Sequence, residues 1–293
     1  MSSRSTVRRP RGPFALPARV LLLAAGIASI ALGAINLFHE RHVSEVDNLY
    51  LGIAAAIGIL WLVSLVLAFR GFKAAVTAAG TIAFVEFGVI GSSHFVTGPA
   101  GMSLYVKSEG LSVAPILMAL MVTCLLTFMT AIVCWSHPTG HLKRVRMLPF
   151  LLSSIAGATL VILYATDSVR RDDFGTASTE DGTFAAVVSA IFWLFGGLWI
   201  ARVRKTGALL IALGTFMATF SFTALHLARG GHSIVEIAAK SGPAWAVVAT
   251  AMAGLAYISL AFALTILLVS LFVRRRSAAR PATAAPARRS DSA

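Results

Sequence analysis

Long apolar segments separated by short polar ones dominate the pattern along the chain. Eight of these segments are close to or above the ~20 residues that a helix needs to cross the hydrocarbon core of a bilayer; one of them, residues 148–164, is a little short. The eight segments are residues 20–38, 49–69, 74–95, 111–135, 148–164, 184–201, 207–227 and 243–273. The pattern therefore predicts an all-α integral membrane protein with eight transmembrane helices.

The polar residues divide the chain into two membrane regions, two tails and a linker. Residues 1–17 and 274–293 are rich in Arg, Pro, Ala and Ser, a composition typical of disorder. We expect both to be disordered basic cytoplasmic tails, and the apolar run after the first tail to be an uncleaved helix. Residues 18–135 and 147–273 are each predicted to hold four membrane helices. Residues 136–146 join them as a cytoplasmic linker.

The distribution of basic residues predicts the orientation in the membrane. Only 13% of the 293 residues are charged, yet the formal net charge is +13, whereas soluble domains carry about 25% charged residues. With the N-terminus inside, 19 of the 25 Lys and Arg residues fall on the inner side. This is the positive-inside pattern of a multi-pass cell-membrane protein with both termini in the cytoplasm. The charge therefore does not indicate nucleic-acid binding, although the tails could bind anionic lipid.

The chain resembles itself when it is shifted by 132 residues without a gap. Residues that are rare in this sequence coincide, and the order of apolar segments agrees as well. The coincident pairs include Trp61 with Trp193, Arg70 with Arg202, Lys73 with Lys205, and His94 with His226. We interpret the chain as two parallel four-helix repeats, because an even number of spans gives both halves the same orientation. Parallel-repeat transporters have such halves, related by an axis along the membrane normal.

A short segment after His226 has the pattern of a helix that lies at the membrane surface. Ile234, Val235 and Ile237 are apolar, while Glu236 and Lys240 stand four residues apart. An amphipathic stretch of this kind favours an interfacial helix on the outer side.

Five of the seven histidines fall near the predicted outer side of the membrane. Imidazole is a common ligand of transition metals and of haem iron. The five residues are His39, His42, His94, His226 and His232. Two interpretations remain open: His94 and His226 are symmetric residues at helix ends, each followed by a glycine turn, or some of the five histidines converge on a metal or haem.

Glu86 lies near the middle of an apolar segment, where an acidic residue is costly and usually functional. Its counterpart in the repeat is Ala218, so the symmetry does not require it. One interpretation is a protonated side chain that bonds to Thr123, Thr127 or Thr130 on the next helix. The other is a proton-relay or substrate site.

Three functions are compatible with these features. The first is a small transporter or permease with its site between the two halves and Glu86 as the proton or substrate site. The second is a membrane redox protein that holds haem or a metal through the outer histidines, and the third is a non-catalytic partner or assembly factor. The chain has no Walker, dinucleotide, hydrolase or kinase signature. These absences argue against a nucleotide-driven enzyme, whereas a membrane enzyme of another kind stays open, and neither the substrate nor a cofactor is specified.

Overall fold

A computed structural model describes residues 15–43, 48–96, 101–135, 148–175, 177–200, 203–227 and 233–278. These residues form helices and short connections, without a β-strand among them. The 136–146 linker lies outside the described residues. So do the two predicted tails, except that α1 includes residues 15–17 and α10 includes residues 274–278.

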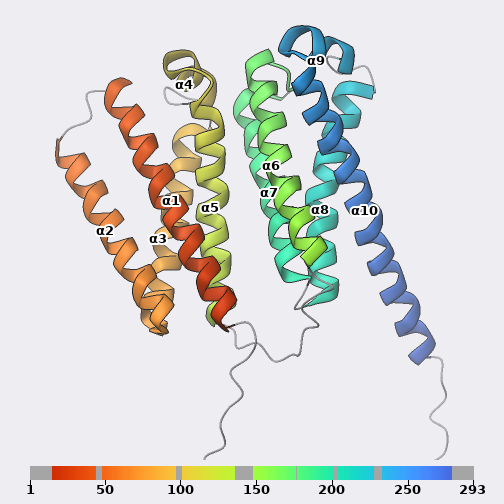
Figure 1. Cartoon of the computed structure of the whole chain (residues 1–293), viewed down its shortest axis with the longest axis horizontal. Helices are drawn as coiled ribbons and strands as arrows, with labels where there is room; N and C mark the ends of the chain where they lie inside the picture. The colour runs from red at the N-terminus through yellow and green to blue at the C-terminus, as the bar shows by residue number, and fades with distance from the viewer. Residues whose placement is uncertain are drawn as a thin grey trace, which may run out of the picture.

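Eight of the helices are long and apolar enough to cross a membrane. The predicted all-α, multi-pass membrane protein is therefore confirmed. In chain order the elements are α1 (Ala15–Val43), α2 (Asn48–Arg70), α3 (Lys73–His94), α4 (Met102–Glu109), α5 (Val113–Trp135), α6 (Leu148–Arg171), α7 (Thr179–Trp199), α8 (Arg204–Phe222), the π-helical turn η2 (Thr223–Leu227), α9 (Ile234–Ser241) and α10 (Pro243–Ala278). The short helices α4 and α9 lie at the same end of the bundle (Figure 1), which we call the α4/α9 end.

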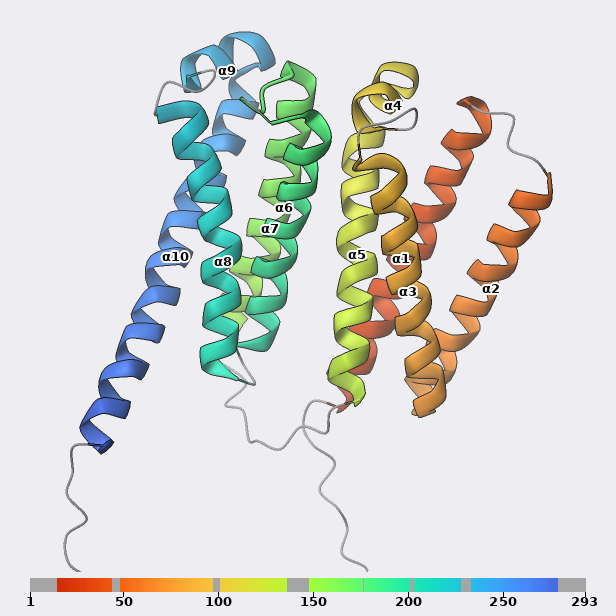
Figure 2. The ribbon, with the colours of Figure 1, turned by 180° about the vertical axis from the view of Figure 1, so that it is seen from behind.

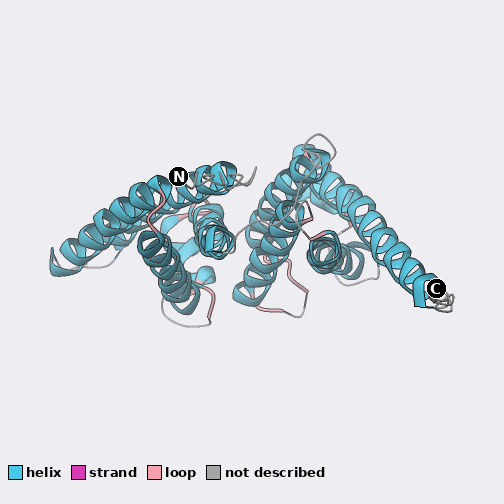
Figure 3. Ribbon diagram, turned by 90° about the horizontal axis from the view of Figure 1, so that it is seen from below, coloured by secondary structure: helices cyan, strands magenta, loops and turns pink. Residues whose placement is uncertain are grey.

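The long helices form two groups of four that stand side by side (Figures 1 and 2). The first group contains α1, α2, α3 and α5, and the second contains α6, α7, α8 and α10. Equivalent helices pack in equivalent ways, because α1 contacts α2 and α5 as α6 contacts α7 and α10. In the same way α3 contacts α2 and α5, and α8 contacts α7 and α10. The view along the helices shows the two groups separately (Figure 3).

The short elements at the α4/α9 end also keep the 132-residue spacing. Helices α4 and α9 both have eight residues, and each ends at a glycine of positive φ, Gly110 (φ 90°) and Gly242 (φ 97°). Gly110 N–H donates to Val106 O at 2.9 Å, and Gly242 N–H donates to Ala238 O at 3.0 Å. The equivalent bonds and helix contacts agree with the predicted internal repeat, and the repeat and the relation of its halves by a rotation about the membrane normal both stay predictions.

The predicted spans of α6 and α7 are shorter than the helices, by seven residues at the end of α6 and by five at the start of α7. Helix α6 continues to Arg171, whereas its apolar segment ends at residue 164. Helix α7 begins at Thr179 rather than at residue 184, because Ser178 caps it through Asp181 N–H. Polar residues in these extra turns bond other polar groups, as Arg171 bonds Asp167 and Glu180 accepts from Ser103, and a hydropathy pattern does not detect such contacts.

Small residues let the helices of the second half pack closely. A Cβ on Gly157 of α6 would lie 2.5 Å from the Trp193 ring of α7. A Cβ on Gly214 of α8 would lie 2.6 Å from two backbone atoms of α7, the nitrogen of Trp193 and the carbonyl oxygen of Ser189. Close approach of this kind stabilises helix pairs in lipid, where apolar burial gives little driving force.

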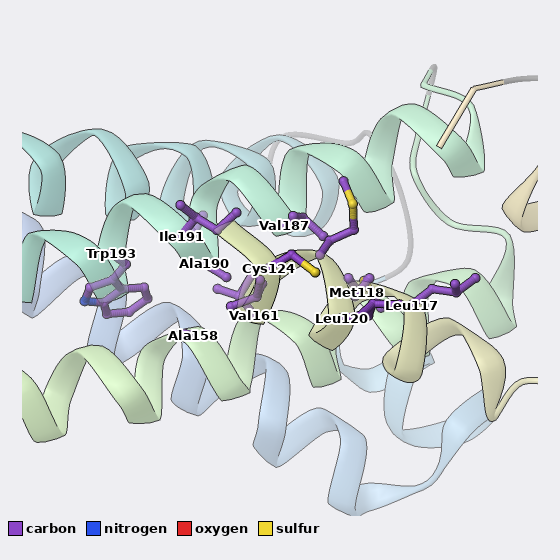
Figure 4. Close-up of a cluster of buried hydrophobic side chains, with 14 of the residues drawn as sticks. Leu117, Met118, Leu120, Cys124, Ala158, Val161, Val187, Ala190, Ile191 and Trp193 are labelled. Atoms are coloured by element: carbon purple, nitrogen blue, oxygen red, sulfur yellow. The ribbon is translucent and has the colours of Figure 1, made fainter. Parts of the chain in front are cut away.

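The two halves meet mainly through apolar side chains. Leu117, Leu120 and Cys124 of α5 are fully buried and face the region of Val187 and Ala190 on α7 (Figure 4). At the α4/α9 end a polar contact joins the halves. Glu180 of α7 accepts hydrogen bonds through Oε1 from the Ser103 N–H of α4 at 3.0 Å and from its hydroxyl at 2.6 Å.

Candidate functional site

Glu86 lies on the face of α3 that meets α1. Its Oε1 is 4.0 Å from the position that a Cβ on Gly33 would occupy, so the carboxyl group fits over the bare backbone of α1. The threonines of α5 do not bind it. Thr123, Thr127 and Thr130 each donate to a carbonyl of their own helix, at 3.0, 2.7 and 2.7 Å.

A polar stripe runs along the face of α1 that Glu86 meets. Ser29, Gly33, Asn36 and Glu40 are spaced by four, three and four residues, which places them on one side of a helix. Ser29 and Asn36 are buried, and the Ser29 hydroxyl donates to Ala25 O at 2.9 Å. The stripe extends about 16 Å along the axis of α1.

His94 closes this stripe at the α4/α9 end. It is 3% exposed, and its Nε2 lies 3.3 Å from Glu40 Oε1. Its ring stacks on Tyr105 of α4, with 4.8 Å between the ring centroids. Asn36 links the other members, because its Nδ2 donates to Glu40 Oε1 at 2.9 Å and its Oδ1 accepts from the Tyr105 hydroxyl at 3.4 Å. We call Asn36, Glu40, His94 and Tyr105 the Glu40 cluster.

Two carboxylates and two imidazoles lie in or beside the Glu40 cluster. Glu109 lies beside it, with Oε2 3.5 Å from His39 Nδ1. Burial raises the pKa of Tyr105, and the negative charges of Glu40 and Glu109 raise it further. Tyr105 therefore remains a neutral hydrogen-bond donor.

His226, the counterpart of His94, is also buried at the α4/α9 end but has different partners. Its Nε2 lies 2.6 Å from the Tyr164 hydroxyl of α6, and Phe222 meets its ring edge to face. His226 belongs to η2, the π-helical turn that ends α8. Such turns insert an extra residue into a helix and often mark functional positions.

A buried ionic cluster lies next to this pair on α6. The Arg171 guanidinium bonds Asp167 Oδ2 through Nε at 2.9 Å and also bonds Asp173. The three side chains are 3 to 4% exposed. Asp167 Oδ1, Ser168 Oγ and Arg171 Nη2 are buried without a hydrogen-bond partner among the described residues. A buried network of this kind is strongly destabilised when one partner is removed.

A cavity of about 350 Å³ lies within the second half. It is bounded by α6, α7 and α8, with Met252 of α10 at its far side. Tyr164 is on its wall, so the cavity reaches the Tyr164–His226 pair, while Phe174 and Asp181 line it at the α4/α9 end. The expected site between the halves therefore differs from the observed cavity, which is inside one half.

The structure brings together only some of the predicted site residues. His94 lies on the same helix as Glu86, α3, with Glu40 of α1 beside it, whereas His226 belongs to the other half. His39 bonds Glu109. The His42 side chain and His232 lie outside the described residues. In the described part of the chain, no three His, Cys, Asp or Glu residues are arranged to hold a metal ion, so a metal or haem site stays a prediction.

Sequence reasoning missed Asn36, Glu40 and Tyr105 in the first half, and Asp167 and Arg171 in the second. The spacing of the polar residues on α1 is a signal that could have found the first group. The i, i+4 spacing of Asp167 and Arg171 is the corresponding signal on α6. Both groups were hidden because they occupy helix ends, where polar residues are ordinary.

Comparison with family models, with curated proteins and with solved structures finds no match for this chain.

Proposed function

We propose that the chain is a small proton-coupled transporter, in which the first half binds the proton and the second half binds the substrate. The observation that carries this proposal is the row of ionisable residues between α1 and α3, which Glu40 of α1 forms with Glu86 and His94 of α3. Ionisable side chains inside membrane helices are costly, and in transporters they mark proton and substrate paths.

The proton path starts at the α4/α9 end. His94 and Tyr105 are the first groups on it, Glu40 is the next, and Glu86 lies deeper on α3. Glu86 and His94 are eight residues apart, which is about 12 Å along the helix. A proton therefore passes between them through Glu40 and water rather than directly. His39, Glu109, Tyr50 and Cys124 are further ionisable groups near these residues in the described part of the chain.

The cavity supplies the second requirement of a transporter, which is a place for the transported molecule. It lies between membrane helices and the α6–α7 connection, and pockets between bundled helices are common ligand sites. The α4/α9 end is the outer side in this proposal, because the basic residues predict that both termini are cytoplasmic.

The proton site can be tested without knowing the substrate. Infrared difference spectra of the detergent-solubilised protein, recorded while the pH is raised, report each carboxyl group that loses its proton. We expect a carboxyl signal that is missing in Glu86→Gln and retained in Asp172→Asn, which changes an exposed acid of the α6–α7 connection. A full set of carboxyl signals in Glu86→Gln would show that Glu86 does not exchange a proton.

Transport is tested in proteoliposomes that contain a pH-sensitive dye. Addition of a transported molecule should cause a proton flux in the wild type that is absent in Glu86→Gln. Equal substrate-induced flux in both proteins would overturn the coupling role of Glu86.

A further inference from the structure

The walls of the second-half cavity are built mainly from small residues. Gly182, Ala185 and Ala186 line it from α7, Ala218 lines it from α8, and Ala224 lines it from the π-helical turn η2. Ala185 and Ala186 follow Gly182 by three and four positions, which places all three on one side of α7, and that side presents little side-chain volume. The cavity is therefore a consequence of residue size at the contact of α7 with α8 and α6.

Aromatic rings border the cavity at several points. Tyr164, Phe174 and Phe220 lie on its wall. The position of Phe174 depends on a glycine, because a Cβ on Gly182 would lie 2.0 Å from the Phe174 ring. Aromatic faces carry partial negative charge and attract cations within about 6 Å of the ring centre.

Asp181 is the charged residue among those that line the cavity. It is exposed at the α4/α9 end, where its Oδ2 accepts from the Ser178 hydroxyl at 2.9 Å. No Lys or Arg is on the cavity wall in the described part of the chain. The guanidinium of Arg171 bonds Asp167 and Asp173 instead, and none of these three side chains lines the cavity. The fixed charge at the cavity is therefore negative.

We propose that this cavity binds a small aromatic organic cation. The aryl ring lies between the alanine-lined walls of α7 and α8, and the ammonium group lies near the Asp181 carboxylate. The transported substrate belongs to this chemical class, and that identification rests on the proposed transport function. The binding itself does not depend on proton coupling.

Two probes of the same shape test the chemistry of the site. Trimethylphenylammonium and tert-butylbenzene differ in the atom that joins the three methyl groups to the ring, which is a cationic nitrogen in one and a neutral carbon in the other. Binding of each is measured by equilibrium dialysis against the full chain in detergent micelles, with thermal unfolding as a second readout. We expect saturable binding of the cation and much weaker binding of the neutral molecule.

Variants then locate the bound probe. Asp181→Asn should weaken binding of the cation about fivefold, which is the size expected for a partly exposed charge interaction. Asp172→Asn is the matched control, since it also removes one negative charge at the α4/α9 end, from the α6–α7 connection, but does not line the cavity. We expect it to bind as the wild type does. Ala186→Phe or Ala224→Leu should abolish binding by filling the cavity, and the unfolding temperature shows whether each variant is folded.

The outcomes separate this proposal from the one on transport. Absence of saturable cation binding, or equal binding by Asp181→Asn and the wild type, overturns the cationic site. Equal binding of both probes shows an apolar site for a neutral molecule or a lipid chain, and it also overturns the proposal. The Glu86 carboxyl signal is measured independently of cation binding. A Glu86 signal without cation binding shows that the cationic site is wrong, and cation binding without a Glu86 signal shows that the proton site is wrong.

Discussion

His94 Nε2 lies 3.3 Å from Glu40 Oε1, across the contact between α3 and α1. The pair is more than a helix terminus, because His94 is buried and stacked on Tyr105. Its counterpart His226 bonds Tyr164 at 2.6 Å instead. The two halves thus place a histidine at the same position and give it a carboxylate partner in one half and a phenol in the other.

Glu86→Gln should fold and express normally, because glutamine keeps the volume of the side chain and its ability to form hydrogen bonds. If Glu86 binds the transported proton, the variant should lose the pH dependence of transport in proteoliposomes. Glu86→Leu separates this role from a structural one, since a leucine at a buried site that also faces polar groups of α1 should lower stability. Unchanged pH dependence in Glu86→Gln would falsify the proton role.

The Tyr164–His226 hydrogen bond should contribute about 1 kcal/mol to stability. His226→Ala is expected to cost about 2 kcal/mol, because it leaves a buried hydroxyl without a partner and removes the ring that packs on Phe222. A double-mutant cycle with Tyr164→Phe, measured by denaturant unfolding in detergent, isolates the bond. A coupling energy indistinguishable from zero contradicts the expected contact.

The stability of the folded protein should fall above pH 10 partly because of Tyr105. The unfolded chain ionises this tyrosine near its ordinary pKa of 10.0, whereas burial keeps it protonated in the folded state to a higher pH. The folded state then holds more protons than the unfolded state, so stability decreases as pH rises through this window, by at most about 1.4 kcal/mol per pH unit. Tyr105→Phe should be slightly less stable at pH 8 but show a flatter decline. Parallel curves for the two proteins would contradict this prediction.

Gly110→Ala and Gly242→Ala should lower stability by similar amounts, on the order of 1–2 kcal/mol each. Both glycines have positive φ, and no atom lies within 4 Å of an added Cβ at either one. The loss in each case therefore comes from backbone strain alone. Gly254→Ala is the control, because that position is equally open but lies inside α10 with ordinary helical φ. It should be neutral or slightly stabilising, and thermal unfolding compares the three. A large difference between the first two would argue against the repeat.

Reporter fusions at Asp47, Gly110 and Ser178 should locate these three positions outside the cell. The expectation follows from the basic residues, of which 19 of 25 are predicted to lie inside. A reporter that is active only in the cytoplasm should be inactive at all three sites and active when it is fused to the C-terminus. A cytoplasmic signal at any of the three would overturn the topology.

The eight membrane helices could be predicted because their signal is a property of whole segments. Helix α9 could be predicted as well, from the alternation of apolar Ile234 and Ile237 with Glu236 and Lys240. Its capping box, in which Ser233 and Glu236 bond each other's backbone N–H groups, agrees with that pattern. Helix α4 was missed, because Gly101 precedes it without a capping side chain.

The candidate sites were less predictable, because they depend on contacts between helices that no local pattern specifies. Glu86 could be recognised as unusual from its depth alone, yet its position over Gly33 depends on how α3 meets α1. Glu40 and Arg171 look like ordinary residues at helix ends, and their burial appears only when α4 and the α6–α7 connection fold over them. The cavity depends on which small residues of α7 face those of α8. The sequence contains those residues but does not show their pairing.

The contact between Glu180 and Ser103 has a consequence for how the two halves can move. A single carboxylate oxygen of α7 holds both the backbone N–H and the hydroxyl of a residue on α4. The rest of the contact between the halves is largely apolar, and the Phe95 and Phe184 rings meet edge to face there. Apolar burial is non-directional, so the hydrogen bonds of Glu180 to Ser103 are the directional contact that a rocking motion at the α4/α9 end would break. Separation of the halves at that end therefore requires that the Glu180 carboxylate find other hydrogen-bond donors.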